Sequence, residues 1–361
     1  MSLKKRLELI RQVGEEIVTE NELRQLLGEK KHPIAYDGFE PSGNVHIAQG
    51  LLRAINVNKM TKAGCRFKML VADWHGWANN KMGGDLDKIK TVGKYLMEVW
   101  KVAGMDLDKV EFIWVSDYVK DEEYWKKVMQ IARNTTIKRI IRCGQIMGRK
   151  DNEVLQSSQI LYPCMQAADI FHLEADICQL GMDQRKVNVL AREIGPKLGL
   201  WKPVIVSHHM LMGLTPPKFH LIPTASAEDR TVELKMSKSI PDSSIFMTDP
   251  AKEVKRKISK AYCPPKIIQE NPILEYMKYI IFERYGKVNI ERDKKFGGDL
   301  EIKNYLELEK LYAGGEIHPL DLKNAASNYI NDLLEPVRKH FDKNKKAKEL
   351  LNFIKKQDVT R

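Results

Sequence analysis

Short apolar runs rich in β-branched and aromatic residues alternate with longer amphipathic stretches over the first two thirds of the chain. This alternation is typical of βαβ units, which build a mostly parallel sheet covered by helices on both faces. The runs that we interpret as strands are 34–37, 67–73, 110–117, 176–180 and 204–208. Ligands bind such sheets beyond the carboxyl ends of the strands, so we expect the chemistry in the segments that follow these runs.

Both ends of the chain have a helical pattern. Residues 2–29 predict two helices, and the second opens with the capping-box pattern Thr19-x-x-Glu22. From about Pro250 the strand pattern stops, and amphipathic stretches follow one another. These stretches are 253–262, 272–285, 302–312, 320–341 and 345–356.

The length of 361 residues favours two domains, and the patterns add a short N-terminal part to them. We predict N-terminal helices over residues 1–30 that pack on an α/β domain over 31–249. A separate all-α domain follows over 250–361. The second boundary is soft, because Asp249-Pro250 breaks the chain without a flexible linker.

Composition narrows the class of protein. No apolar run approaches the ~18 residues of a membrane span, and the start of the chain mixes acids and bases where a signal peptide would be apolar. The five cysteines lie far apart without a C-x-x-C pattern, so we expect neither disulfides nor a zinc site. We therefore expect a cytoplasmic protein with no membrane contact and no metal held by the protein.

Lys and Arg number 60 against 48 Asp and Glu, which gives a net charge of +12. From Glu335 onward there are nine basic and four acidic residues, so this terminal region carries +5 of that charge. Such a balance suits a polyanionic partner, although a solvated charged tail is the ordinary alternative.

The segment 38–50 leaves the first predicted strand, turns on Pro-Ser-Gly and enters a helix. Backbone amides and the positive end of the helix dipole favour an anion at such a turn. His46 and Gln49 stand at i and i+3, so both can donate hydrogen bonds to phosphate oxygens from one helix face. The segment matches neither a Walker A loop nor G-x-G-x-x-G, and a plain strand-to-helix turn stays open as the alternative.

Far downstream, Lys-Met-Ser-Lys-Ser occupies 235–239 between a strand and the helical domain. Two lysines and two hydroxyls on a loop suit transient binding of a pyrophosphate as charge builds in a phosphoryl-transfer transition state. An exposed basic loop is the alternative.

In this order, the two segments resemble the signature elements of class I aminoacyl-tRNA synthetases. The stretches 36–43, 161–170 and 181–186 are similar to those of tyrosyl-tRNA synthetases of the eukaryotic and archaeal branch, and the likeness covers about residues 30–340. The chain departs from the family pattern twice. Gln49 stands where the family has a second histidine, and it donates a hydrogen bond but cannot be cationic. The stretch 216–234 is also longer than is typical.

The resemblance implies a Rossmann-like catalytic domain with a tyrosine pocket. Tyr36 and Asp169 would surround the phenolic hydroxyl. A buried acceptor there would reject phenylalanine, because phenylalanine would leave the acceptor without a hydrogen-bond donor. Tyr162, Gln166 and Asp169 share one helix face by their spacing, although a core helix with one polar edge has the same pattern. Tyr162, Gln166 and Gln184 would surround the ammonium, with Glu40 near it. His75 would border the pocket, although a structural role is the alternative for a lone histidine.

The resemblance further implies that the substrate ATP, accompanied by Mg²⁺, binds beside this pocket. Asp183 would accept a hydrogen bond from the ribose and Gly181 would allow the nucleotide to approach, whereas a helix-capping aspartate is the alternative. The catalytic residues implied are His46, Gln49, Lys235 and Lys238. The nucleotide-binding residues implied are these four together with Gly38, Gly181, Asp183 and Ser239.

In the helical domain, 295–300 and 317–324 resemble the family's anticodon-reading segments. Phe296 and His318 would stack on the first anticodon base, a guanine, and Asp321 would accept hydrogen bonds from it. Gly-Gly turns and a capping aspartate are the alternative.

The resemblance also implies a homodimer, with a connective insertion at about 121–154 supplying the interface. Trp125, Ile131 and Ile140 are the expected apolar contributors.

The sequence thus predicts an ATP-dependent tyrosyl-tRNA synthetase whose partners are L-tyrosine, ATP and tRNA(Tyr). A tryptophanyl-tRNA synthetase shares the architecture, but Asp169 with Tyr36 favours a phenol over an indole. An RNA-binding relative that uses the scaffold structurally, for instance in intron splicing, is the rival of another class. The presence of both nucleotide motifs speaks against it.

Overall fold

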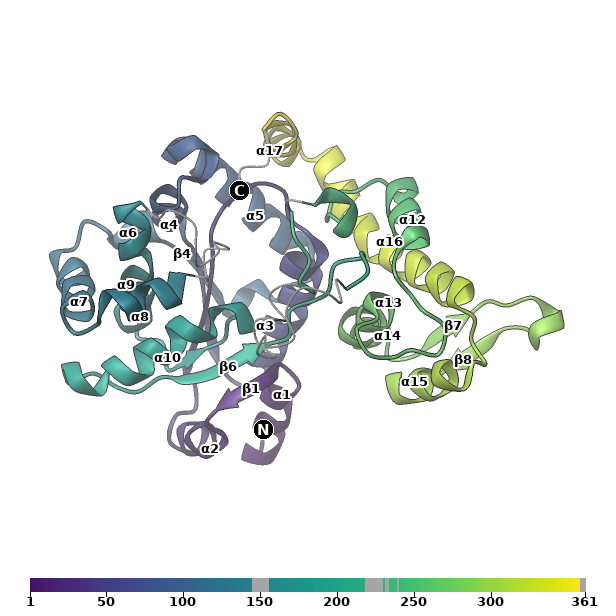
Figure 1. The fold of residues 1–361 in the computed structure, drawn as a ribbon, viewed down its shortest axis with the longest axis horizontal. Coiled ribbons are helices and arrows are strands. Elements are labelled where there is room, and N and C mark those ends of the chain that lie inside the picture. Colours follow the sequence, from purple (N-terminus) through teal and green to yellow (C-terminus); the bar gives the residue numbers. More distant parts are fainter. Residues whose placement is uncertain (145–155, 218–229, 231–233, 239, 358–361) are drawn as a thin grey trace.

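The computed structural model describes residues 1–357 apart from 145–155, 218–229, 231–233 and 239 (Figure 1). Its centre is a six-stranded sheet in the order β1-β6-β5-β2-β3-β4. All pairs are parallel except β1 with β6, so the five strands expected from the sequence are confirmed. Their bounds are β2 (Ile34–Phe39), β3 (Arg66–Val71), β4 (Val110–Trp114), β5 (Ile177–Cys178) and β6 (Val204–His208).

The N-terminal segment contains a strand that the sequence did not predict. Between α1 (Leu3–Arg11) and α2 (Glu20–Glu29), β1 (Gly14–Val18) adds an antiparallel edge to the sheet. Because this segment contains two consecutive glutamates, it is too polar to be predicted as a strand from the sequence. The predicted capping box at the start of α2 is confirmed, because Glu22 N–H donates to Thr19 Oγ1 and Thr19 N–H donates to Glu22 Oε2.

Each face of the sheet has its own apolar core. Phe67 and Met69 of β3 belong to the core that α3 (Arg53–Lys62) and α5 (Leu86–Val102) cover. Leu70 belongs to the opposite core, under α9 (Ser157–His172) and α10 (Arg185–Ile194). This division follows from the period of two along a strand, which sends successive side chains to opposite faces. The remaining helices of this part are α4 (Asp73–Ala78), α6 (Val115–Tyr118), α7 (Glu122–Arg133) and α8 (Ile137–Cys143).

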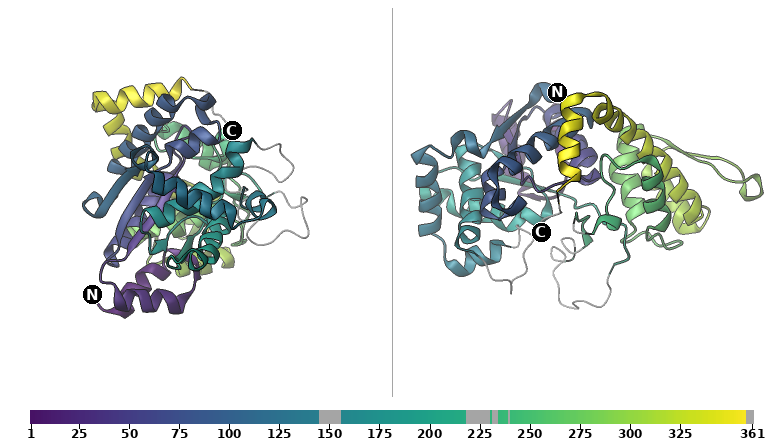
Figure 2. Two further views of the ribbon diagram at one scale, coloured as in Figure 1. Left: turned by 90° about the vertical axis from the view of Figure 1, so that its left-hand side faces the viewer. Right: turned by 90° about the horizontal axis from the view of Figure 1, so that it is seen from above.

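The C-terminal part lies to one side of the sheet and is mainly helical (Figures 1 and 2). Its helices are α12 (Ala251–Lys260), α13 (Pro272–Tyr276), α14 (Phe282–Tyr285), α15 (Tyr305–Gly314), α16 (Pro319–Lys343) and α17 (Lys345–Lys355). It also contains an antiparallel hairpin, β7 (Val288–Ile290) with β8 (Leu300–Ile302), where the sequence predicted helices alone. Strands of three residues are too short to give a readable alternation.

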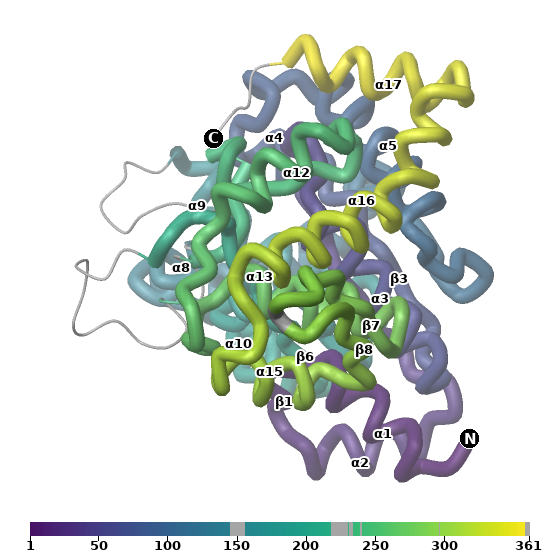
Figure 3. Tube along the Cα trace, turned by 90° about the vertical axis from the view of Figure 1, so that its right-hand side faces the viewer, coloured from purple at the N-terminus to yellow at the C-terminus, as the bar shows by residue number. Residues whose placement is uncertain are grey.

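The two parts are joined by packing as well as by the chain. Helix α17 turns back and packs on α5 of the sheet domain (Figure 3). Just before it, His340 Nε2 lies 2.9 Å from Glu98 Oε2, and the Phe341 ring packs against Tyr95 at 5.3 Å between centroids. The core of α3 and α5 continues into the C-terminal helices without a break.

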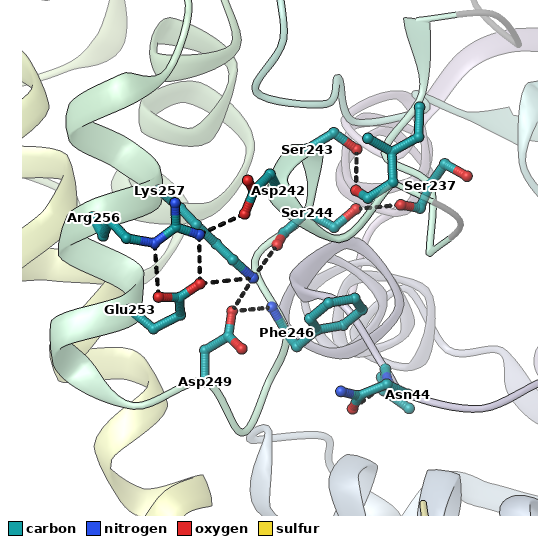
Figure 4. A network of polar contacts seen from close by, with 12 residues as sticks. Asn44, Ser237, Asp242, Ser243, Ser244, Phe246, Asp249, Glu253, Arg256 and Lys257 are labelled. Carbon is teal, nitrogen blue, oxygen red and sulfur yellow. Dashed lines mark hydrogen bonds and ion pairs between the residues drawn. The ribbon is translucent and has the colours of Figure 1, made fainter. Parts of the chain in front are cut away.

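A buried lysine organises the segment that enters the C-terminal helices (Figure 4). Lys257 of α12 donates to the Ser244 carbonyl and to Asp249 Oδ2, both at 2.8 Å. Ser244 Oγ in turn donates to the Ser237 carbonyl at 2.7 Å. Because Ser237 lies between Lys235 and Lys238, this network ties these lysines to α12.

None of the described helices combines the length and the apolar character needed to cross a membrane. All five cysteines are buried free thiols.

Candidate functional site

The turn after β2 holds two buried polar atoms that the described residues leave unpaired. They are Nδ1 of His46 and Oε1 of Gln49. Burial, reinforced by the ammonium groups of Lys238 and Lys235, holds the pKa of His46 well below its usual range. The imidazole is therefore neutral, and an unpaired polar atom at such a position is available to a ligand.

The lysine segment docks against this turn. Lys235 Nζ lies 2.6 Å from Asp183 Oδ2, and Lys238 Nζ donates to Ser42 Oγ at 3.2 Å. Between them, Met236 is buried, and its N–H donates to the Leu211 carbonyl at 2.8 Å. The structure thus brings together Asp183, both lysines and the turn that carries His46. Ser239 lies outside the described residues.

Two further charged groups surround Lys238. Burial and the neighbouring Lys81 ammonium lower the pKa of Lys238 to about 8, against an opposing effect of the Glu40 carboxylate. Lys81 itself lies 3.5 Å from Glu40 Oε1, and Asn79 donates to Glu40 Oε2 at 3.0 Å. Glu40 is therefore held among cations beside the turn.

The side chains of Tyr36, Tyr118 and His75 surround Asp169, which is 0% exposed. Tyr118 Oη donates to Oδ1 at 2.8 Å. His75 Nε2 lies 3.1 Å from Oδ2 but is not aligned for a hydrogen bond, so within the described part of the chain Oδ2 keeps free acceptor capacity. Burial, with the charge of Asp169, raises the pKa of Tyr36 well above its usual range, so its hydroxyl keeps its proton.

The other expected pocket residues lie along the same wall. The Tyr162 ring meets the His75 ring edge to face at 4.9 Å between centroids. Gln166 Nε2 donates to Gln184 Oε1 at 3.0 Å. Burial and the nearby Glu40 carboxylate raise the pKa of the Tyr162 hydroxyl well above its usual range. Tyr162 and Asp169 therefore both adjoin His75, and Gln166 and Asp169 both act on Tyr36, as expected of residues on one helix face.

The two glycines differ in what surrounds them. A Cβ on Gly38 would meet protein atoms no closer than 3.6 Å, so the packing of the chain itself does not demand glycine there. A Cβ on Gly181 would come within 2.4 Å of Met210 Sδ and 2.6 Å of Asp183 Oδ1. A side chain at position 181 would therefore displace the ends of the Met210 and Asp183 side chains.

Sequence reasoning missed Tyr118, Lys81 and Arg53. Tyr118 stands just after β4, in one of the segments where chemistry was expected, so that rule was sufficient to find it. Arg53 was not predictable, because its partners come from three separate strands. Its Nη1 donates to Asp37 Oδ2 at 2.6 Å, and it also bonds Gln179 and His208.

In the C-terminal part, one arginine links the 295–300 segment to the residue that precedes the 317–324 segment. Arg292 donates to the Gly298 carbonyl at 2.9 Å and to the Glu316 carbonyl at 2.8 Å. His318 caps α16, where its Nδ1 accepts from Leu320 N–H, and it is exposed. Asp321 lies in the first turn of that helix, and the side chain of Phe296 is outside the described part. The loop between β7 and β8 projects at the right-hand edge of Figure 1.

The expected interface segment forms α7 and α8, as far as it is described. Ile131 and Ile140 are buried in the core of their own chain, so the expectation that they face a second subunit is wrong. The exposed apolar side chains there are Met129 (60%), Ile137 (67%) and Ile141. Trp125 is half-buried, and its Nε1 donates to the Val119 carbonyl.

No group of three or more His, Cys, Asp or Glu side chains is arranged to hold a metal ion among the residues that the structure describes.

The sequence and the fold match those of a known class of enzyme. The family model for class I tRNA synthetases of tryptophan and tyrosine matches residues 29–335, and the chain belongs to this family.

Its relatives are those of the tyrosine branch. The chain is 53% identical to tyrosine–tRNA ligase 1, cytoplasmic, of Arabidopsis thaliana, over 99% of this chain and 90% of that one. The solved tyrosyl-tRNA synthetase of Pyrococcus horikoshii complexed with L-tyrosine has a TM-score of 0.89 and 37% identity, covering 98% and 100% of the two chains. That of Leishmania major in complex with tyrosinol has a TM-score of 0.88 and 45% identity; the match covers 98% of this chain but only 60% of that one.

Proposed function

We propose that this chain is a tyrosine–tRNA ligase, which activates L-tyrosine with ATP and transfers the tyrosyl group to tRNA(Tyr). The observation that carries the proposal is the buried Asp169 carboxylate with one unbonded oxygen, enclosed by Tyr36, Tyr118 and His75. A buried acceptor among aromatic rings suits a phenol, because the ring is apolar and the hydroxyl supplies the missing donor. The relatives of the tyrosine branch support the same substrate.

Tyrosine binds with its hydroxyl toward Asp169 and Tyr36. Its ammonium faces the amides of Gln166 and Gln184 and the hydroxyl of Tyr162. The Glu40 carboxylate near Tyr162 adds a negative charge on that side. This leaves the carboxylate of tyrosine directed toward the turn after β2.

In the first step, a carboxylate oxygen of tyrosine attacks the α-phosphorus of ATP and the bond to the pyrophosphate oxygen breaks. Tyrosyl-adenylate and pyrophosphate result, and no side chain becomes covalently attached. His46, Gln49, Lys235 and Lys238 stabilise the charge that develops on pyrophosphate, and Mg²⁺ accompanies the phosphates of the nucleotide. The free His46 Nδ1 fits this role, because the neutral ring can carry its hydrogen on this buried atom, which has no partner among the described residues; Gln49 would donate from its amide nitrogen.

The nucleoside of ATP occupies the edge formed by Gly38, Gly181 and Asp183. The Lys235–Asp183 ion pair, which brings the lysine segment to this edge, supports this placement. Ser239 completes the lysine segment in this proposal.

The tyrosyl group then passes to the terminal ribose of the tRNA, whose anticodon binds the C-terminal part. Phe296 and His318 stack on the first anticodon base and Asp321 accepts hydrogen bonds from it. The Arg292 bridge supports this proposal, because it draws the two segments toward one surface.

Two copies of the chain form the working enzyme in this proposal, joined through α7 and α8. The exposed Met129, Ile137 and Ile141 support this surface. The cytoplasmic relative supports a cytoplasmic location.

The central test is tyrosine-dependent ATP–pyrophosphate exchange. The purified chain should exchange pyrophosphate with L-tyrosine and show little exchange with phenylalanine or tryptophan, because only the phenol satisfies Asp169. Preference for tryptophan would support the tryptophanyl alternative. Absence of exchange with all three would favour an RNA-binding scaffold.

Asp169→Asn should weaken selectivity for tyrosine over phenylalanine by about 10- to 100-fold, since it replaces a charged acceptor with an amide of the same shape. ATP affinity should change little. Steady-state exchange with each amino acid measures the selectivity, and Asp169→Ala serves as a second variant. Unaltered selectivity in a folded variant would contradict the assignment.

Exchange should depend on the charge of Lys238. A lysine is cationic below its pKa, so kcat/KM for ATP should fall as the pH rises through about 8, where Lys238 loses its proton. Lys238→Arg keeps its charge at higher pH and should move the decline upward. Measurement at saturating tyrosine removes the titration of the amino acid. Identical profiles for the two proteins would show that another group titrates.

Asp321→Ala should reduce charging of tRNA without changing exchange, because the residue lies far along the chain from the adenylation site. Loss of a base-edge contact costs about 1–3 kcal/mol of discrimination at the first anticodon base. Aminoacylation of four transcripts that differ at that base measures the effect. Lys345→Ala in α17 is the control, since loss of a phosphate contact weakens all transcripts equally and lowers the salt dependence. An unaltered ranking of the four would refute the assignment.

A further inference from the structure

Four polar side chains form a network beneath the nucleotide edge of the sheet, and the mechanism above does not use it. Asp37 lies in β2, Gln179 follows β5, and His208 ends β6. These strands are neighbours in the sheet, so their carboxyl ends lie side by side. Arg53 of α3, which is only 1% exposed, reaches all three side chains.

The hydrogen bonds of Arg53 fix the orientation of its partners. A guanidinium only donates, so Gln179 must present its Oε1 to Arg53 and its amide nitrogen to His208. His208 Nδ1 lies 3.1 Å from Arg53 Nη1 and 3.1 Å from Gln179 Nε2. Both neighbours are donors, so Nδ1 is an acceptor and carries no hydrogen. The hydrogen of the neutral ring is therefore on Nε2.

The charge state of the ring agrees with this geometry. Burial and the Arg53 guanidinium hold the pKa of His208 well below its usual range. The other groups that face the ring are His209, which also lowers this pKa, and the backbone of Leu180, which raises it. At neutral pH the ring is thus an uncharged donor.

This donor faces the nucleotide edge. No described residue accepts a hydrogen bond from Nε2, and the His208 side chain is partly exposed. Nε2 lies 3.5 Å from the position that a Cβ on Gly181 would take, and Asp183 Oδ1 lies 2.6 Å from the same point. A donor and an acceptor thus lie near each other at the end of β5, where Met210 Sδ, 2.4 Å from the same point, is their neighbour.

We propose that His208 donates a hydrogen bond from Nε2 to a ribose hydroxyl of ATP, with Arg53 and Gln179 as positioning residues that hold its tautomer. This inference rests on the proposed function, which brings the ribose to Asp183. A hydroxyl both donates and accepts, so it fits between the carboxylate and the imidazole N–H. The cis-diol of ribose offers two such groups, and deoxynucleotides lack one of them.

The first experiment combines His208→Phe with nucleotide analogues. ATP affinity, measured by calorimetry, should fall about tenfold, with tyrosine affinity unchanged, since one hydrogen bond is lost. One of the two analogues, 2′-deoxy-ATP or 3′-deoxy-ATP, lacks the hydroxyl that His208 contacts. The parent and the variant should bind that analogue with equal affinity. His32→Phe is the matched control. His32 lies beside Gly64, just before the amino end of β2, and therefore at the opposite end of the strands from His208. It should leave ATP binding unaltered.

The second experiment tests the positioning role. Gln179→Met removes one donor to Nδ1 and keeps the Arg53–Asp37 ion pair, so the fold should survive. In ¹⁵N-histidine-labelled protein, the parent should show His208 with hydrogen on Nε2 alone. The variant should show a mixture of tautomers and a reduced ATP affinity. A parent that carries the hydrogen on Nδ1 would overturn the inference.

The outcomes separate the two proposals. The role of His208 is overturned if the parent and His208→Phe bind ATP with equal affinity. It is also overturned if His208→Phe loses the same affinity for ATP and for both deoxy analogues. Either result counts even when tyrosine-dependent exchange is normal. The expected ATP effects in a protein without tyrosine-dependent exchange support His208 and refute the proposed function alone. A parent that does not bind ATP refutes both.

Discussion

The alternation of side chains along β2 is the constraint on which the site depends. Tyr36 belongs to the core under α9, and Asp37 turns to the opposite face, where Arg53 of α3 binds it. A one-residue shift in register would exchange these two faces. Because β2 lies in the middle of the sheet, the same strand lines the aromatic pocket on one face and anchors the buried polar network on the other. The two meet at its carboxyl end.

The strength of the hydrophobic pattern decides which parts of the fold and the site could be predicted from the sequence. The central strands are continuous apolar runs, and the positions of Tyr162, Gln166 and Asp169 follow the helical period, so both were predictable. The edge strand β1 and the β7–β8 hairpin are short and partly polar, so their patterns are too weak to read. Which residues of the 121–154 segment face the core was also not visible, because burial of Ile131 and Ile140 depends on how α7 and α8 pack on α9.

Contacts between distant segments lie beyond sequence reasoning of this kind. Arg53 could be read as an ordinary charged residue of an amphipathic helix, yet its three partners are 16, 126 and 155 residues away. Likewise, Lys257 belongs to a lysine-rich helix, and only the packing shows that it is buried against Asp249 and Ser244. In both cases a buried cation is retained because several acceptors converge on it, which is the condition for burying charge without a large penalty.

The Asp183 carboxylate shows how the docked lysine segment and a bound nucleotide are compatible. Lys235 pairs with Oδ2, whereas Oδ1 is the oxygen that lies beside Gly181. An ionised carboxylate offers acceptor sites on both oxygens, so a ribose hydroxyl can bind Oδ1 while Lys235 remains on Oδ2. The lysine segment is already held by Met236, by the Ser244 link to Ser237 and by Lys238 at Ser42. These contacts hold Lys235 and Lys238 beside the turn after β2, so in the proposed mechanism the protein itself positions the cations that face pyrophosphate, as electrostatic preorganisation requires.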